Sequence, residues 1–242
     1  MRARLATEDD VAALARLGAA RRRRLAEWAP VWWRMADGAD ELHPLWLAHL
    51  VTSAGPVARV VDDSGEIVAG AIALPQGPTW FVDDVAATTE EAAACLLDAV
   101  TERPALTCVP AADADGSRRA GAAGWAHVSS YWIGPPAAGE ADAPAGAWTG
   151  PVPPHTFGPA LAGGWAGGLP APPVYDPGGT VTIVATVAGP DRAAALGAEL
   201  ADAARRGDVL LALVVGADDE DLAMAAAAAG LERTVDVRAA PA

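Results

Sequence analysis

Two tracts of this chain resemble each other, and this constrains the fold more than any other feature of the sequence. Val109–Gly124 aligns with Val215–Gly230, with an Ala-Ala-Gly ending and two aspartates at matching positions. Upstream, Val82–Ala86 aligns with Val184–Ala188. Each tract reads as strand–helix–strand–helix–strand, so we interpret the second as a partial duplicate of the first. The alternative is that alanine-rich units of this type look alike by composition alone.

The composition allows a packed core in more than one unit. The chain has 242 residues, of which 52% are apolar and 20% charged. Short β-branched runs alternate with amphipathic helical segments, a pattern that predicts a mixed α/β protein. A stretch dense in Pro and Gly interrupts this pattern between the two tracts. We therefore predict a first domain over residues 1–136, a linker over 137–173 and a half-domain over 174–242.

Charge and hydropathy exclude several classes of partner. The formal net charge is −14, whereas a nucleic-acid-binding protein needs a basic face. We interpret the single basic run, Arg21–Arg24, as a solvated helix surface. No stretch approaches the roughly 20 apolar residues of a membrane span, and the first residues do not read as a signal peptide, so we expect a cytoplasmic protein. The spacing of His43 and His49 predicts no metal site.

Three motifs of the first tract resemble those of the GNAT superfamily of N-acetyltransferases. Residues 4–10 resemble its opening R-x-A-T-x-x-D strand and helix, Trp80–Ala86 its fourth strand, and Ala122–Trp125 the end of its fourth helix. The predicted order β-α-α-β-β-β-α-β-α-β over residues 2–133 is also that of the GNAT fold. The resemblance implies a complete GNAT-like copy followed by a C-terminal half-copy.

The same resemblance implies a reaction and a cofactor. The reaction would be acetyl transfer from acetyl-CoA, as cosubstrate, to an amine carried by a small molecule or a protein. In this family the pyrophosphate binds backbone amides at the start of the helix after strand four. The pantetheine arm lies along the open edge of that strand. This assigns cofactor contacts to Val85 and Ala86 in the first tract, and to Val187 and Ala188 in the second.

The phosphate-binding signature of the family, Q/R-x-x-G-x-G/A, departs from its pattern in both tracts. The first-tract match, Thr88–Ala93, contains no Arg or Gly and includes two glutamates, which would repel a phosphate. The second-tract match keeps Arg192 and Gly197, which we predict to contact the pyrophosphate. That site would be a composite one, since the acceptor pocket would come from the first tract. The alternative is that Arg192 is a plain surface residue.

The catalytic machinery is also incomplete relative to the family. Asp84 or Asp83, at the end of the fourth strand, is our candidate for the general base, and a solvated strand end or helix cap is the alternative. The tyrosine that often serves as general acid corresponds to Ala120 and Ala226. A catalytically inactive GNAT-like domain that binds a small molecule or a protein partner is therefore the alternative function. A third interpretation makes the half-copy a built-in mimic of a dimer partner, and the sequence also permits a homodimer.

A tryptophan-rich segment falls where the family builds its acceptor pocket. Trp32, Trp33 and Arg34 could stack on an aromatic or cationic ligand, so we assign them to the substrate pocket. Core packing is the alternative, since tryptophan contributes strongly to cores.

Overall fold

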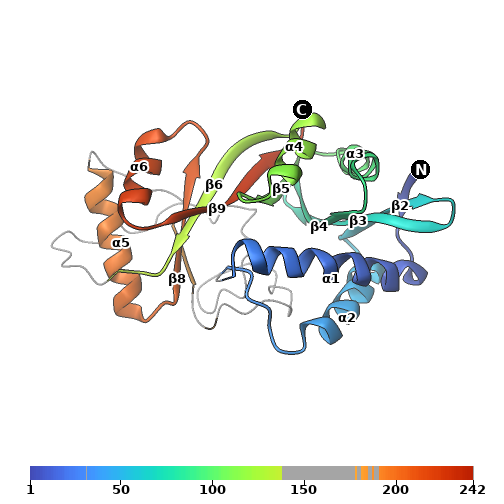
Figure 1. The fold of residues 1–242 in the computed structure, drawn as a ribbon, viewed down its shortest axis with the longest axis horizontal. Coiled ribbons are helices and arrows are strands. Elements are labelled where there is room, and N and C mark those ends of the chain that lie inside the picture. The colour runs from blue at the N-terminus through green and yellow to red at the C-terminus, as the bar shows by residue number, and fades with distance from the viewer. Residues whose placement is uncertain (31, 138–177, 179–180, 185–186, 188–190, 242) are drawn as a thin grey trace.

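The computed structural model describes residues 1–30, 32–137, 178, 181–184, 187 and 191–241. They form one nine-stranded mixed sheet with the strand order β1-β2-β3-β4-β5-β9-β6-β8-β7 and helices on both faces (Figure 1). The mixed α/β class expected from the sequence is confirmed. The predicted linker over 137–173 lies outside the described residues, except for its first position. None of the helices in the described ranges is long and apolar enough to cross a bilayer.

The first tract has the element order that the GNAT resemblance implied. Strands β1 to β4 pair antiparallel, and β4 pairs parallel with β5. Helices α1 and α2 cover one face of the sheet and α3 and α4 the other (Figure 1). The elements are β1 (Arg2–Leu5), the 3-10 turn η1 (Glu8–Asp10), α1 (Val11–Trp28), α2 (Ala39–Thr52), β2 (Val57–Asp63), β3 (Glu66–Gln76), β4 (Thr79–Ala87), α3 (Glu90–Ala99), β5 (Ala105–Pro110), α4 (Ala114–Ala122) and β6 (Ala126–Gly134).

The second tract repeats the second half of this order. A parallel pair of strands, β7 and β8, is connected through α5, and α6 leads from β8 to the last strand, β9. Helices α5 and α6 pack on inward-facing leucines of β8 and form a separate part of the core. The elements are β7 (Val181–Val184), α5 (Arg192–Arg206), β8 (Leu210–Gly216), α6 (Glu220–Ala228) and β9 (Glu232–Ala239).

The two tracts exchange their last strands. β9 lies between β5 and β6, and β6 in turn pairs with β8 (Figure 1). Cys108 is opposite Val237, and Val214 is opposite Tyr131. These two pairs are equivalent under the alignment of Val109 with Val215. The halves of the sheet are thus related by an approximate twofold axis between β6 and β9, and each tract completes the sheet of the other.

A buried polar cluster marks this axis. Asp236 of β9 is 3% exposed and lies opposite Ser130 of β6. Ser130 Oγ donates to Asp236 Oδ1 at 2.9 Å, and Arg233 donates to both carboxylate oxygens at 2.8 Å. His127 Nε2 lies 2.9 Å from Ser130 Oγ. A slip of one residue in this register would separate the buried Asp236 carboxylate from Ser130, although Arg233, on the same strand, would stay with it, so the cluster favours a single pairing.

A second buried carboxylate, Asp10, ties the start of α1 to the first strand. Arg4 of β1 donates to its two oxygens at 2.7 and 2.8 Å, and the backbone N–H of Thr7 donates at 2.8 Å. These hydrogen bonds, of which those from Arg4 have the largest effect, lower the pKa of Asp10 to about 2 although the residue is only 5% exposed. The ionised form is therefore built into the fold.

Replacing Asp10 with asparagine tests this contribution. Because the pKa of Asp10 is lower in the folded protein, its carboxylate stabilises the fold at pH values above the ordinary pKa of 3.8. This stabilisation is lost as the pH falls toward about 2. The gap between the two pKa values corresponds to roughly 2 kcal/mol at neutral pH. We expect Asp10→Asn to lower the urea midpoint at neutral pH and to approach wild type in acid. Asp9→Asn, at the exposed neighbouring position, is the control, and a pH-independent difference would contradict the explanation.

Candidate functional site

The parallel strands β4 and β5 separate partway along their length. They pair only from Trp80 with Ala105 to Val82 with Thr107, whereas β4 continues to Ala87 and β5 to Pro110. At the last pair, Thr107 Oγ1 donates to the carbonyl of Val82 at 2.8 Å. Beyond this point no strand of the described ranges pairs with β4 on the side that faces β5.

A β-bulge in β4 contributes to the separation. Asp83 is opposite Ile72 of β3, but Ala86 is opposite Gly70, so β4 contains an extra residue between these pairs. A bulge of this kind bends its strand and increases the local twist. The end of β4 is thereby directed away from β5.

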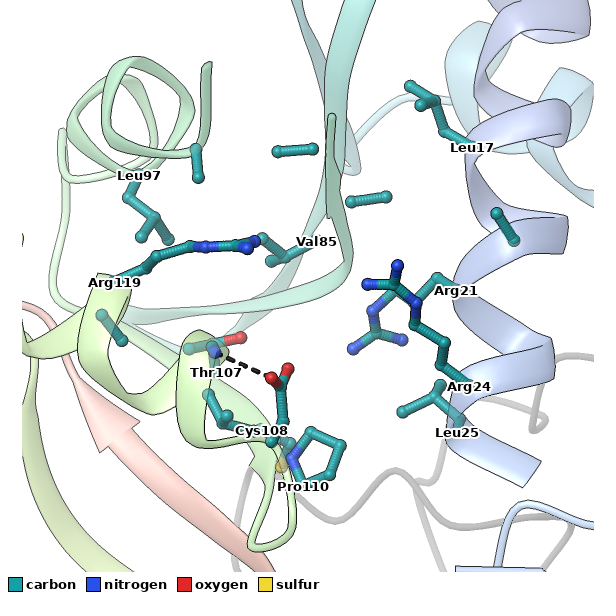
Figure 2. Close-up of a pocket in the computed structure, with 18 of the residues that line it drawn as sticks. Leu17, Arg21, Arg24, Leu25, Val85, Leu97, Thr107, Cys108, Pro110 and Arg119 are labelled. Atoms are coloured by element: carbon teal, nitrogen blue, oxygen red, sulfur yellow. Dashed lines mark hydrogen bonds between the residues drawn. The ribbon is translucent and has the colours of Figure 1, made fainter. Parts of the chain in front are cut away.

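A cavity of about 340 Å³ occupies this gap (Figure 2). Its walls come from α1 on one face of the sheet and from α3 and α4 on the other, so the cavity passes through the sheet. Its apolar and small lining residues include Leu17, Leu25 and Trp28 of α1, Val85, Ala86 and Ala87 of β4, Ala93 and Leu97 of α3, Cys108 and Val109 of β5, and Gly116 and Ala120 of α4.

The charged lining of the cavity is mainly cationic. Arg21 and Arg24 approach from α1 and Arg119 from α4, on opposite sides of β4 (Figure 2). The acidic lining residue is Asp113, whose Oδ1 accepts a hydrogen bond from the backbone N–H of Gly116 at 2.8 Å and so caps α4. Three guanidinium groups against one carboxylate make a locally positive site in a chain of net charge −14, which favours an anionic ligand.

The predicted cofactor-contacting residues of the first tract are at this cavity. Val85 and Ala86 line it directly. Asp83, one of the two candidate bases, is half-buried in β4 opposite Ile72 and is not among the lining residues. The side chain of Asp84 lies outside what the structure describes. The assignment of a base to this pair therefore stays a prediction.

The start of α3 differs from a free phosphate cradle. Thr89 Oγ1 accepts a hydrogen bond from the N–H of Ala92 at 3.1 Å. Glu90 pairs with Arg118 of α4, which lowers the pKa of the Glu90 carboxyl and also holds Asp115 at 3.0 Å. One of the two glutamates expected to repel a phosphate is thus drawn toward α4 and neutralised there.

In the second tract the corresponding positions are joined by an ion pair. Arg192 donates to Asp219 Oδ1 at 2.6 Å and to the carbonyl of Val187 at 3.4 Å. In the alignment of the tracts, Arg192 corresponds to Thr88 and Asp219 to Asp113. Thr88 and Asp113 both line the first-tract cavity. Arg192 is thus engaged within its own tract and does not line that cavity.

Val187 and Gly197, two other second-tract residues assigned to the cofactor, are not at the cavity. Val187 is 4% exposed and packs in the core with α5 and β8. Gly197 is exposed on α5, and a Cβ built on it would meet no atom within 4 Å. Ala188 lies outside the described residues.

The two tryptophans assigned to the substrate pocket are core residues. Trp32 and Trp33 are 3% and 8% exposed and pack against β6, β8 and the end of α1. The Trp32 ring stacks on Tyr131 with 6.1 Å between centroids. Arg34 is exposed and does not line the cavity. Trp32 and Trp33 therefore follow the alternative interpretation, core packing. Trp28, at the end of α1, lines the cavity.

The arginines of the cavity were missed by the reasoning from sequence. The interpretation of Arg21–Arg24 as a solvated surface is right for Arg23 and Arg24, which are exposed, but wrong for Arg22, which is 1% exposed and pairs with Asp40 at 2.7 Å. Arg21 and Arg24 are three positions apart and continue the face of Leu17 and Leu25, a helical period that could have revealed them. Arg119 carries no comparable signal.

Comparisons with solved structures find proteins described as acetyltransferases at low sequence identity. No protein-family model and no curated protein matches the chain. A candidate acetyltransferase from Thermoplasma acidophilum is 13% identical, with 90% of this chain and 88% of that one covered and a TM-score of 0.49. A tandem GNAT protein from the clavulanic acid biosynthesis pathway is 13% identical (82% and 89% covered, TM-score 0.40). The ribosomal-protein-alanine N-acetyltransferase of Brucella melitensis is 18% identical (55% and 90% covered, TM-score 0.43). The element order of residues 2–134 is itself that of the GNAT fold.

Cys108 provides a chemical test of the cavity wall. Desolvation, with a smaller contribution from Asp83, raises the pKa of its thiol far above the ordinary value, and the thiolate is the reactive form. In a Cys95→Ser variant we expect Cys108 to react with iodoacetamide at least about tenfold more slowly in the native protein than in urea. Cys108→Ser, which leaves only Cys95, is the companion measurement. Equal native and unfolded rates for Cys108 would contradict the described environment.

Proposed function

We propose that this chain is a GNAT-type acetyltransferase that binds acetyl-CoA in the gap between β4 and β5 of its first tract and acetylates an amine. The carrying observation is the cavity that crosses the sheet where strand pairing ends at Val82 and Thr107. Its geometry suits an elongated ligand whose two ends lie on opposite faces of the sheet.

The lining residues match the parts of such a cofactor. The end of β4 offers backbone hydrogen-bonding groups to an arm that lies along it as an added strand. Val85 and Leu97 give this passage an apolar wall (Figure 2), and arginines stand at its two sides. An apolar channel with cationic groups fits a pantetheine chain that ends in phosphates.

The transfer itself needs few groups from the chain. Acetyl-CoA, when bound, supplies the activated acetyl group as a thioester. The fold must hold the amine against the carbonyl carbon and accept the proton that leaves its nitrogen as the C–N bond forms and the C–S bond breaks. Asp84 or Asp83 is our proposed acceptor of that proton. On this proposal the acceptor substrate, an amine of a small molecule or a protein, approaches from the α1 face.

One observation favours the alternative of binding without transfer. Ala120, which corresponds to the tyrosine that often acts as general acid in the family, lines the cavity and is 3% exposed. Its methyl group cannot protonate a leaving thiolate. A panel of amines incubated with acetyl-CoA separates the two functions, because cofactor binding without release of free thiol would support a binding protein.

Filling the cavity tests the location of the site. We expect CoA to raise the melting temperature of the protein, since a ligand that binds only the folded state stabilises it by about 2.7 kcal/mol at 100 times its Kd. Ala86→Trp places an indole in the gap and should reduce CoA affinity at least about tenfold by occupying the channel. Isothermal titration of both proteins with CoA provides the measurement.

Two controls accompany this variant. Ala94→Trp adds the same side chain at an exposed position of α3, outside the cavity, and should leave CoA affinity unchanged. Arg192→Ala breaks the ion pair of the second tract and should also leave it unchanged. If Arg192→Ala lost CoA binding and Ala86→Trp retained it, the site would lie in the second tract. If wild type bound no CoA, the proposal would be wrong.

A further inference from the structure

Arg119 of α4 is placed to contact a ligand in the cavity. It is half-buried, lines the cavity, and its side chain extends from α4 below Leu97 toward Val85 (Figure 2). Its Nε is fully buried and has no hydrogen-bond acceptor among the described residues. A buried guanidinium N–H without an acceptor is unfavourable, and a ligand that brings an acceptor into the cavity would remove this cost.

Its neighbour Arg118 shows the contrasting case. Arg118 is exposed and pairs with Glu90 of α3 and Asp115 of α4. The acids on this side of α4 are therefore engaged by Arg118. Asp113, the acidic residue of the cavity lining, uses Oδ1 to cap α4. The two adjacent arginines thus differ in role, one paired at the surface and one directed into the cavity.

The start of α3 does not supply the positive charge that a diphosphate needs. The first-tract signature has neither the arginine nor the glycines of the family, and Glu90 and Glu91 begin the helix. The hydroxyl of Thr89 already takes the amide of Ala92. A cofactor bound in this gap would therefore gain from a cation on another element, and α4 presents one.

We propose that Arg119 binds a phosphate group of the cofactor and so takes over, from α4, the anion recognition that the start of α3 has lost. This inference rests on the proposed function. The planar guanidinium matches phosphate oxygens in a forked geometry, and half-burial strengthens the pairing. Arg119 is in this sense a cofactor-binding residue that the family signature does not contain.

The test measures CoA affinity, salt dependence and stability together. Arg119→Met keeps the length of the side chain without its charge, Arg119→Lys keeps the charge, and Arg118→Met is the matched control on the same helix. We expect Arg119→Met to weaken CoA binding about tenfold or more and to flatten its dependence on salt. Arg119→Lys should recover part of the loss, and Arg118→Met should stay within about twofold of wild type.

Stability separates binding from a structural role. Since Arg119→Met removes a buried donor that has no acceptor in the ligand-free protein, we expect its melting temperature to be unchanged or higher. A lower melting temperature with wild-type CoA affinity would overturn the inference. So would equal affinity and equal salt dependence in wild type and Arg119→Met.

Inorganic pyrophosphate distinguishes this inference from the proposed function. If wild type does not bind CoA, the proposed function fails, whereas Arg119 is still tested by whether pyrophosphate raises the melting temperature of wild type and not of Arg119→Met. The inference would be overturned if pyrophosphate raised the melting temperature of Arg119→Met as much as that of wild type. It would also be overturned if wild type bound no CoA and pyrophosphate left its melting temperature unchanged.

Discussion

The site depends on how strand β5 divides its hydrogen bonds. On one side it pairs with β9 from Leu106 to Pro110, and on the other it pairs with β4 only as far as Thr107. β5 is therefore held in place by the second tract, which leaves β4 free to bend away after its bulge. The cavity results from this division of the β5 hydrogen bonds between β4 and β9. The site of the first tract therefore depends on β9, a strand of the second tract.

Equivalent positions in the two tracts have diverged in opposite directions. In the second tract Arg192 and Asp219 form an ion pair that joins the starts of α5 and α6. In the first tract the corresponding positions line an open cavity, and arginines come instead from α1 and α4. One pair of equivalent positions is thus joined by an ion pair, whereas the other lines a cavity that is available to a ligand.

Local patterns in the sequence predicted the helices and strands, because hydrophobic periodicity and caps are encoded over a few residues. Aligning Val109 with Val215 also reproduces the strand register across the axis. The exchange of β6 and β9 was not predicted, since strand partners far apart in sequence leave no periodic signal. Arg119 was missed for a related reason, because its role depends on a bulge in β4 and on Arg118 engaging the nearby acids. Trp32 and Trp33 were assigned to a pocket, but the exchange of strands created a sheet face that their rings cover.

The buried pair at the centre of the sheet has a consequence for assembly. Ser130 and Asp236 occupy equivalent positions, so a sheet built from two identical tracts would place serine against serine or aspartate against aspartate there. The second arrangement would bring two buried carboxylates together, which is strongly unfavourable. Joining unlike tracts avoids this clash, and pairing of β9 with the β9 strand of a second chain at this position is disfavoured. The difference between serine and aspartate at this one strand position thereby favours pairing of β6 with β9 over pairing of β9 with itself.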